Sequence, residues 1–518
     1  MTRPNIVVIL TDDQRYDYLG CAGHPIVKTP QIDALAAGGV RFRNAFATSA
    51  ACTPNRTCIL TGQYERKHGV TFGSASSLTE PAFRETYPMR LRQAGYYVGY
   101  VGKNHTPIGA AAGINKRPED TPERLATARP SLGYHNGVME GMFDYWYGNH
   151  NHSGFYPKRA HPIYRNAGPD TQVEIFQEGA LNFLKANPAF AGTADFLRTK
   201  PADQPFCLLV NFNLPHGFGT STMRRLPSDP ELYRTVYRDQ LDEMPIPETY
   251  IAREDIETPK IPKHVYNGEY IPSYNYVQKP ADLRERIVRT CQTVTGIDRL
   301  VGAVVAELKE QGVYDNTVIV FSSDHGLLFG EHGLGGKVLL YEESIRVPLI
   351  VFDPRLPADR RGAVSDELAL SIDIAPTILD LAGLPVPEEM QGRSLKPVLE
   401  NPELSWREDF FCENLFMGQN YPRMEGVRSR RYKYIRYFDK QKDRPHFIAL
   451  DASIKGEEPI YEELYDLETD PRELNNLADS PSHQAVLEQY RTRCRELVLA
   501  ARGADDYPKT YRAQHQKK

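Results

Sequence analysis

The sequence lacks any long hydrophobic run. No stretch of its 518 residues approaches the ~20 consecutive apolar residues that a membrane-spanning helix needs. The first five residues lead straight into the apolar run Ile6–Leu10, without the hydrophobic segment and cleavage site of a secretory signal. We therefore expect no membrane association and a cytoplasmic location, or a periplasmic or secreted one if a leader has been removed.

Cysteine and net charge are also scarce. The seven cysteines are scattered, odd in number and without metal-finger spacing, which argues against a disulfide framework. The formal net charge is only -5, so the composition gives no reason to expect a nucleic acid or an anionic membrane surface as partner. An anionic substrate would need cations placed locally.

Apolar runs with strand character alternate with helical patterns over most of the chain. The predicted buried strands are Ile6–Leu10, Tyr97–Val101, Phe206–Phe212, Thr317–Phe321 and Val347–Phe352. The predicted helices are Pro30–Gly38, Arg56–Tyr64, Tyr87–Ala94, Gln172–Ala186, Ala281–Gln311 and Ile372–Leu381. This alternation predicts an α/β sheet covered by helices on both faces.

The length allows more than one domain. A composition shift near residues 385–397 predicts a boundary between a catalytic unit, residues 1–395, and a C-terminal unit, residues 396–518. Residues 226–279 are rich in proline, tyrosine and charge, which is typical of an insertion or lid. In the C-terminal unit we expect a strand or hairpin arm at Gly426–Tyr437, a strand at Glu463–Leu467 and an amphipathic helix at Ser482–Leu499.

Two pairs of metal-ligating residue types follow predicted strands. Asp12 and Asp13 come directly after the first strand, and Asp324 and His325 follow Thr317–Phe321. Ligand crevices of α/β sheets form at such strand ends. Adjacent carboxylates repel each other unless a cation lies between them, and oxygen-rich ligands suit Ca²⁺ or Mg²⁺. A solvated turn would explain either pair alone, but two matched pairs favour a metal site.

Basic residues also follow strands. Lys103 and His105 come after Tyr97–Val101, His216 comes after Phe206–Phe212, and Lys337 closes a glycine-rich run. Each alone would be an ordinary loop residue or a solvated charge. Their shared position at strand ends is what indicates a site.

The most informative segment is Cys52-Thr53-Pro54-Asn55-Arg56, just ahead of a predicted helix. It resembles the signature at which type I sulfatases convert a cysteine to formylglycine, their catalytic aldehyde. With the strand-end residues and the segment Leu464-Tyr465-Asp466-Leu467, nearly the whole chain resembles a type I sulfatase of the alkaline phosphatase superfamily. The resemblance implies a large mixed, mainly parallel sheet between helices, with a smaller C-terminal α+β subdomain.

The resemblance also implies roles for individual residues. The catalytic set would be Cys52, Arg56, Lys103, His105, His216 and Lys337. The metal ligands would be Asp12, Asp13, Cys52, Asp324 and His325. The metal would be one divalent ion, Ca²⁺ before Mg²⁺ or Mn²⁺, and a formylglycine-generating enzyme would be the partner in maturation. His216 would act as the acid and His105 as the base, although sequence alone allows the reverse.

We therefore predict hydrolysis of a sulfate ester. Aromatic and basic residues in Trp146–His152 and Lys263–Tyr266 favour a sulfated carbohydrate over a simple aryl sulfate. One alternative is a phosphonate or phosphate ester hydrolase of the same superfamily, against which the complete Asp12–Asp13 pair argues. The other is a non-catalytic protein that binds sulfated glycans.

Overall fold

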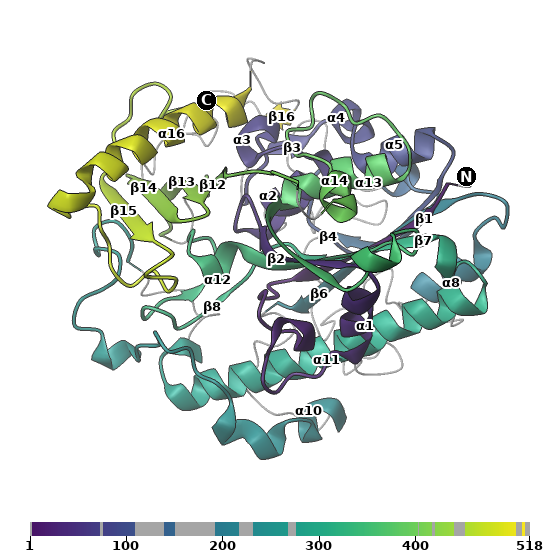
Figure 1. Ribbon diagram of the computed structural model, residues 1–518, viewed down its shortest axis with the longest axis horizontal. Coiled ribbons are helices and arrows are strands. Elements are labelled where there is room, and N and C mark those ends of the chain that lie inside the picture. The colour runs from purple at the N-terminus through teal and green to yellow at the C-terminus, as the bar shows by residue number, and fades with distance from the viewer. Residues whose placement is uncertain are drawn as a thin grey trace, which may run out of the picture.

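A large mixed sheet forms the centre of the molecule (Figure 1). The computed structural model describes residues 3–72, 76–108, 139–150, 192–216, 231–267, 276–401, 404–416, 420–439, 451–503 and 510–512. In spatial order the sheet's strands are β11 (Ala363–Leu370), β2 (Val40–Phe46), β10 (Arg346–Phe352), β7 (Thr317–Ser323), β1 (Asn5–Asp12), β6 (Phe206–Pro215), β4 (Tyr97–Asn104) and β5 (Tyr145–His150). Only β10 runs antiparallel to its neighbours, so the predicted mixed, mainly parallel sheet is confirmed.

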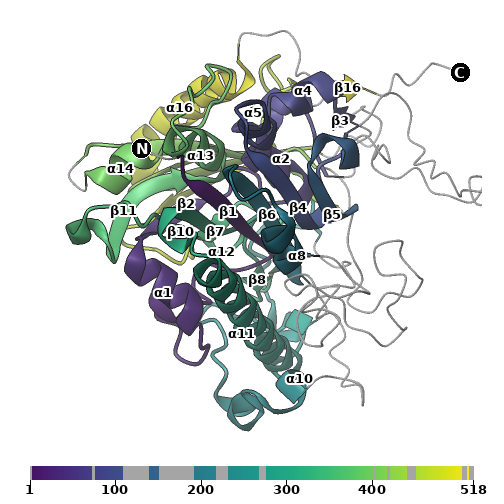
Figure 2. The same cartoon turned by 90° about the vertical axis from the view of Figure 1, so that its right-hand side faces the viewer.

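Helices cover both faces of this sheet (Figures 1 and 2). Successive side chains of a strand point to opposite faces, and β1 divides accordingly: Val7 and Ile9 join one core cluster, while Ile6 and Val8 join the other. The first cluster is covered by α1 (Pro30–Gly38), α8 (Thr193–Thr199) and α11 (Pro280–Glu310). The second is covered by α4 (Glu80–Arg84), α5 (Tyr87–Gln93), α13 (Ile374–Leu381) and α14 (Lys396–Glu400). Burial on both faces explains why the central strands are continuously apolar.

The C-terminal part of the chain forms a second, smaller sheet beside the first (Figure 1). Its antiparallel strands are β12 (Asp409–Asn414), β13 (Arg423–Ser429), β14 (Tyr432–Phe438) and β15 (Tyr461–Asp466). The helix α16 (Gln484–Arg502) packs Leu487, Cys494 and Val498 against it. The predicted C-terminal α+β unit is thereby confirmed. Its boundary at residue 396 stays a prediction, and α14 packs into the core of the larger unit.

Several elements differ from the sequence-based expectation. The helix expected at Arg56 begins at Cys52 as α2 (Cys52–Thr61), because a proline in the first helical turn needs no N–H partner. Gly426–Tyr437 is a hairpin of two strands, β13 and β14. The strands β2, β5, β11 and β12 were not predicted. The predicted helix Gln172–Ala186 lies outside the described residues.

The described part of the 226–279 segment packs against both units. Tyr233 and Met244 enter the core cluster beside α11, while Ile261 and Val265 enter the cluster shared with the C-terminal sheet. Its role as a lid stays a prediction. Among the described residues, no helix combines the length and apolar character needed to cross a membrane. The remaining short elements include α3 (Glu65–His68), α10 (Glu231–Thr235), α12 (Glu342–Ile345), β3 (Ser76–Leu78), β8 (Leu328–Phe329), β9 (Gly335–Gly336) and β16 (Thr510–Arg512).

Candidate active site

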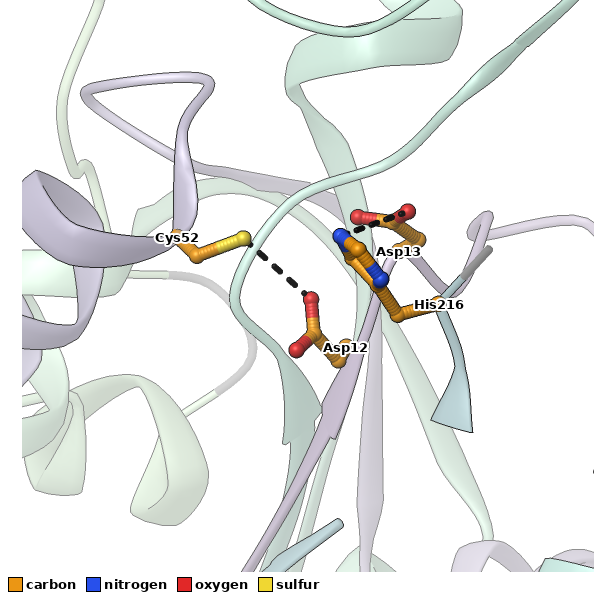
Figure 3. Close-up of side chains that lie close together, drawn as sticks. All are labelled: Asp12, Asp13, Cys52 and His216. Atoms are coloured by element: carbon orange, nitrogen blue, oxygen red, sulfur yellow. Dashed lines mark hydrogen bonds and ion pairs between the residues drawn. The ribbon is translucent and has the colours of Figure 1, made fainter. Parts of the chain in front are cut away.

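The register of the central strands brings the polar strand ends to one edge of the sheet. Asp12 pairs in register with Pro215 of β6, next to His216, and Thr11 pairs with Ser323 of β7, next to Asp324. At the end of β1 the backbone turns through Asp13, whose φ of 64° lies in the left-handed region. Figure 3 shows Asp12, Asp13 and His216 converging near Cys52.

Cys52 lies at the centre of this cluster. It is the first residue of α2 and is fully buried. Its Sγ donates to Asp12 Oδ1 at 3.4 Å, accepts from Lys337 Nζ at 2.9 Å and lies 3.2 Å from His325 Nε2. A residue at the start of a helix faces the unpaired N–H groups there, which favours negative charge.

Each buried carboxylate of the site has a cation within hydrogen-bond distance, and Asp12 also lies 3.6 Å from Arg56 Nη2. Lys103 Nζ donates to Asp12 Oδ2, and Lys337 Nζ donates to Asp13 Oδ1 at 2.9 Å. The third pair joins Arg56 Nε to Asp324 Oδ2 at 2.8 Å. Three carboxylates and three cations sum to zero charge. A bound dication and a released sulfate dianion would preserve that neutrality, as a buried site requires.

Arg56 also contacts the ends of two strands. Its Nη2 lies 3.3 Å from the carbonyl oxygens of Thr11 and Phe212, and its Nη1 lies 3.5 Å from Asn211 Oδ1. A planar guanidinium can direct several donors at fixed angles, which a lysine cannot. Arg56 therefore fixes the orientation of α2 relative to β1 and β6.

The donor atoms fit a hard metal ion. One donor atom from each of Asp12, Cys52, Asp324 and His325 lies within 4.8 Å of the others, and all four residues are buried. The same holds for Asp12, Asp13, Cys52 and His216. Carboxylate oxygens supplemented by one imidazole suit Ca²⁺, Mg²⁺ or Mn²⁺.

Electrostatics separate the two adjacent carboxylates. Burial opposes ionisation of Asp12, but Lys103 and the other nearby cations hold the pKa of Asp12 well below its usual range. Burial raises the pKa of Asp13, and Lys337 only partly offsets it. Burial, and then the charge of Asp12, raises the pKa of the Cys52 thiol well above its usual range. A thiol held protonated is a poor nucleophile, so Cys52 is unsuited to attack as an ordinary cysteine.

The two histidines of the predicted catalytic set are both buried. His216 Nε2 lies 3.8 Å from Asp13 Oδ2, inside the cluster around Cys52. His105 follows β4 directly, and its ring makes an edge contact with Phe72 at 5.8 Å between centroids. Seven of the ten predicted site residues lie at or directly after the ends of β1, β4, β6 and β7, while Cys52 and Arg56 lie on α2 and Lys337 follows β9. Their roles remain predictions.

Other polar residues support the site without having been predicted. Asn55 Nδ2 donates to the Asp324 carbonyl, and Asn55 Oδ1 accepts from Ser371 Oγ at 2.7 Å. Asn211, beside Arg56, could have been identified from the sequence, because it is a polar residue inside an apolar strand. In contrast, Trp146 stacks on Tyr100 at 4.9 Å, and Tyr266 stacks on Tyr421 at 5.1 Å, so both rings serve packing.

Comparison with known proteins agrees with this geometry. A family model described as Sulfatase matches residues 4–384, and one described as N-sulphoglucosamine sulphohydrolase, C-terminal, matches residues 330–499. The first match covers most of the chain. The protein therefore belongs to the sulfatase family, within the alkaline phosphatase superfamily.

Similar proteins cover nearly the full length of the chain. An N-acetylglucosamine-6-O-sulfatase of Bacteroides thetaiotaomicron is 28% identical over 92% of this chain and 82% of its own. An arylsulfatase of Clostridium perfringens is 29% identical over 94% and 93%. The crystal structure of a phosphonate monoester hydrolase of Agrobacterium radiobacter superposes with a TM-score of 0.68 at 25% identity, covering 96% of both chains.

Proposed function

We propose that the protein is a sulfatase that hydrolyses an O-sulfate ester of a carbohydrate, with a formylglycine derived from Cys52 as its nucleophile. The observation that carries the proposal is the position of Cys52. It is buried at the start of α2, within reach of three carboxylates and two histidines, and Lys337 donates to its sulfur. Similarity to an N-acetylglucosamine-6-O-sulfatase supports a sugar substrate.

The proposed reaction uses the hydrated aldehyde of residue 52. One hydroxyl of the geminal diol loses its proton to Asp324 and attacks the sulfur atom, and the S–O bond to the sugar breaks. His216 donates a proton to the departing alcohol oxygen. His105 then removes the proton of the second hydroxyl, the aldehyde re-forms and sulfate leaves. Covalent catalysis of this kind divides one difficult displacement into two easier steps.

Fixed cations stabilise the charge on the sulfate oxygens. Lys103 and Lys337 lie among the carboxylates around residue 52, close enough to bind the oxygens of the sulfate. Arg56 holds Asp324 and the start of α2 in place. A divalent ion held by Asp12, Asp13, Asp324 and His325 would polarise the sulfate and lower the pKa of the diol.

The second candidate function is hydrolysis of a phosphonate monoester. It is favoured by the close superposition with the Agrobacterium enzyme. The sulfatase is favoured by Asp13, which provides a second carboxylate beside Asp12 and pairs with Lys337.

A direct comparison of substrates tests the proposal. Protein matured with a formylglycine-generating enzyme is incubated with glucosamine-6-sulfate, 4-nitrophenyl sulfate and a 4-nitrophenyl phosphonate monoester. We expect the highest kcat/KM for the sugar sulfate, and a peptide carrying residue 52 that is about 18 Da lighter than its cysteine form. Preference for the phosphonate would favour the second candidate, and binding without turnover would favour a glycan-binding protein.

A further inference from the structure

A continuous series of aromatic rings begins at His105. The His105 ring meets Phe72 edge-on at 5.8 Å, and Phe72 meets Phe416 edge-on at 5.0 Å. The series continues from Phe416 to Tyr421 at 6.2 Å, and then to Tyr266. Its inner rings, Tyr421 and Tyr266, are buried in the core cluster. Phe72 and Phe416 are only partly buried, and Phe72 lies beside His105.

Hydrogen bonds hold Phe416 at a fixed place relative to the segment that carries Cys52. Asn414, at the end of β12, accepts from the Phe416 N–H at 3.2 Å and donates to its carbonyl at 2.9 Å. One residue earlier, Glu413 donates its N–H to the Thr48 carbonyl at 3.0 Å. Thr48 lies four residues before Cys52. The C-terminal unit thus presents Phe416 at a fixed position relative to the nucleophile.

Phe72 is held by the other unit. It follows α3, whose His68 places Nε2 3.3 Å from Cys58 Sγ on α2. His105 is also anchored near α2, because the adjacent Thr106 Oγ1 lies 3.4 Å from Thr57 Oγ1. The pair of rings is therefore built from both units and faces the end of β4.

We propose that Phe72 and Phe416, whose ring planes meet at 85°, form an apolar platform shaped as a corner, against which the pyranose ring of a sulfated sugar packs while its sulfate lies among the cations around residue 52. This proposal rests on the proposed function and names residues that would bind the sugar ring of its substrate. Phe72 contacts His105, which lies two residues after Lys103 of the cluster. A pyranose has a face of C–H groups that fits an aromatic surface, whereas its hydroxyls remain in water. A sulfate ester without a ring would leave the platform uncovered.

Kinetics of ring-replacement variants test the platform. Phe416→Leu and Phe72→Leu keep apolar volume but remove the flat ring. We expect each to raise KM for glucosamine-6-sulfate about 2- to 10-fold, which is the affinity lost when one aromatic contact is removed. The kcat should change less than about twofold. KM for methyl sulfate should not change, and Phe416→Trp should restore the wild-type KM for the sugar.

Tyr490→Leu is the matched control. Tyr490 is a partly buried aromatic of the C-terminal unit that packs on Tyr432 at 5.8 Å and does not belong to the ring series. The Tyr490→Leu variant should leave KM for the sugar unchanged. Equal KM effects on sugar and methyl sulfate, no effect on either, or a larger effect on choline sulfate would overturn the platform.

Failure of the proposed function would be seen separately. In that case the wild-type protein releases sulfate from none of these esters. Calorimetric titration with glucosamine-6-sulfate then still decides the platform, because weaker binding by Phe416→Leu than by wild type supports it. Equal affinity, or no binding to wild type, overturns it.

Discussion

Arg66 provides the sharpest test of how the two units are joined. Its side chain is completely buried, with Nε 3.0 Å from Glu413 Oε2 and Nη2 2.5 Å from Glu425 Oε1. Burial raises the pKa of Glu413, and Arg66 partly counteracts this rise. The Arg66→Ala substitution would take the paired cation from Glu413, whereas Glu425 keeps its pair with Arg436. Breaking a buried pair in this way costs about 3–5 kcal/mol of unfolding free energy.

The loss should depend on pH with a definite sign. Without Arg66, the pKa of Glu413 in the folded state lies further above its unfolded value, so the folded state binds more protons. Stability of the variant therefore falls as pH rises, and the deficit should shrink on going from about pH 8 to about pH 5. The double variant Arg66→Met/Glu413→Gln, which removes both charges, should recover much of the loss.

Urea unfolding of these variants measures the effect. Arg198→Ala is the control, since its pair with Glu307 is half exposed and worth ~0–1 kcal/mol. A loss in Arg66→Ala no larger than that in the control, or a deficit that grew at acidic pH, would contradict a buried pair at this position.

Three further outcomes follow from the geometry. Burial, and then the charges of Glu331 and Glu473, raises the pKa of Glu343 to about 8, so wild-type stability should fall as pH rises from 4.5 towards 8. In urea unfolding, Glu343→Gln should remove that slope and gain more than ~1 kcal/mol of unfolding free energy at pH 8. An unchanged slope would contradict this. Asn55→Ala should cost ~1–3 kcal/mol in the same assay, because the Asp324 carbonyl loses its Asn55 donor and the Ser371 hydroxyl, which also contacts Thr48, loses its Asn55 acceptor. A loss below ~0.5 kcal/mol would argue against the bridge. EDTA should stop sulfate release, and added Ca²⁺ should restore it. Circular dichroism should show no unfolding, because each site carboxylate keeps its arginine or lysine partner. Unfolding on chelation would contradict this.

The sequence predicted the central sheet well where burial on both faces makes a strand continuously apolar. The strands β1, β6 and β7 are of this kind. The strand β11 was missed because it lies at the sheet edge and alternates between partly buried and exposed residues. Hydrophobicity does not encode strand direction, so the reversal of β10 was not predictable.

The residues of the candidate site were predictable because their types and order match a family pattern at strand ends. The contacts around them were not, since they depend on distant parts of the chain. Asn55 reaches Ser371, and Phe72 meets Phe416, across more than 300 residues. No local periodicity records such pairs.

The central claim is that residue 52 performs the chemistry. The most direct measurement is the initial rate of sulfate release from glucosamine-6-sulfate by matured wild type and by the Cys52→Ala variant, with circular dichroism confirming that both are folded. Wild type should release sulfate, and the variant should release none above background. A folded variant that retained most of the wild-type rate would contradict this claim.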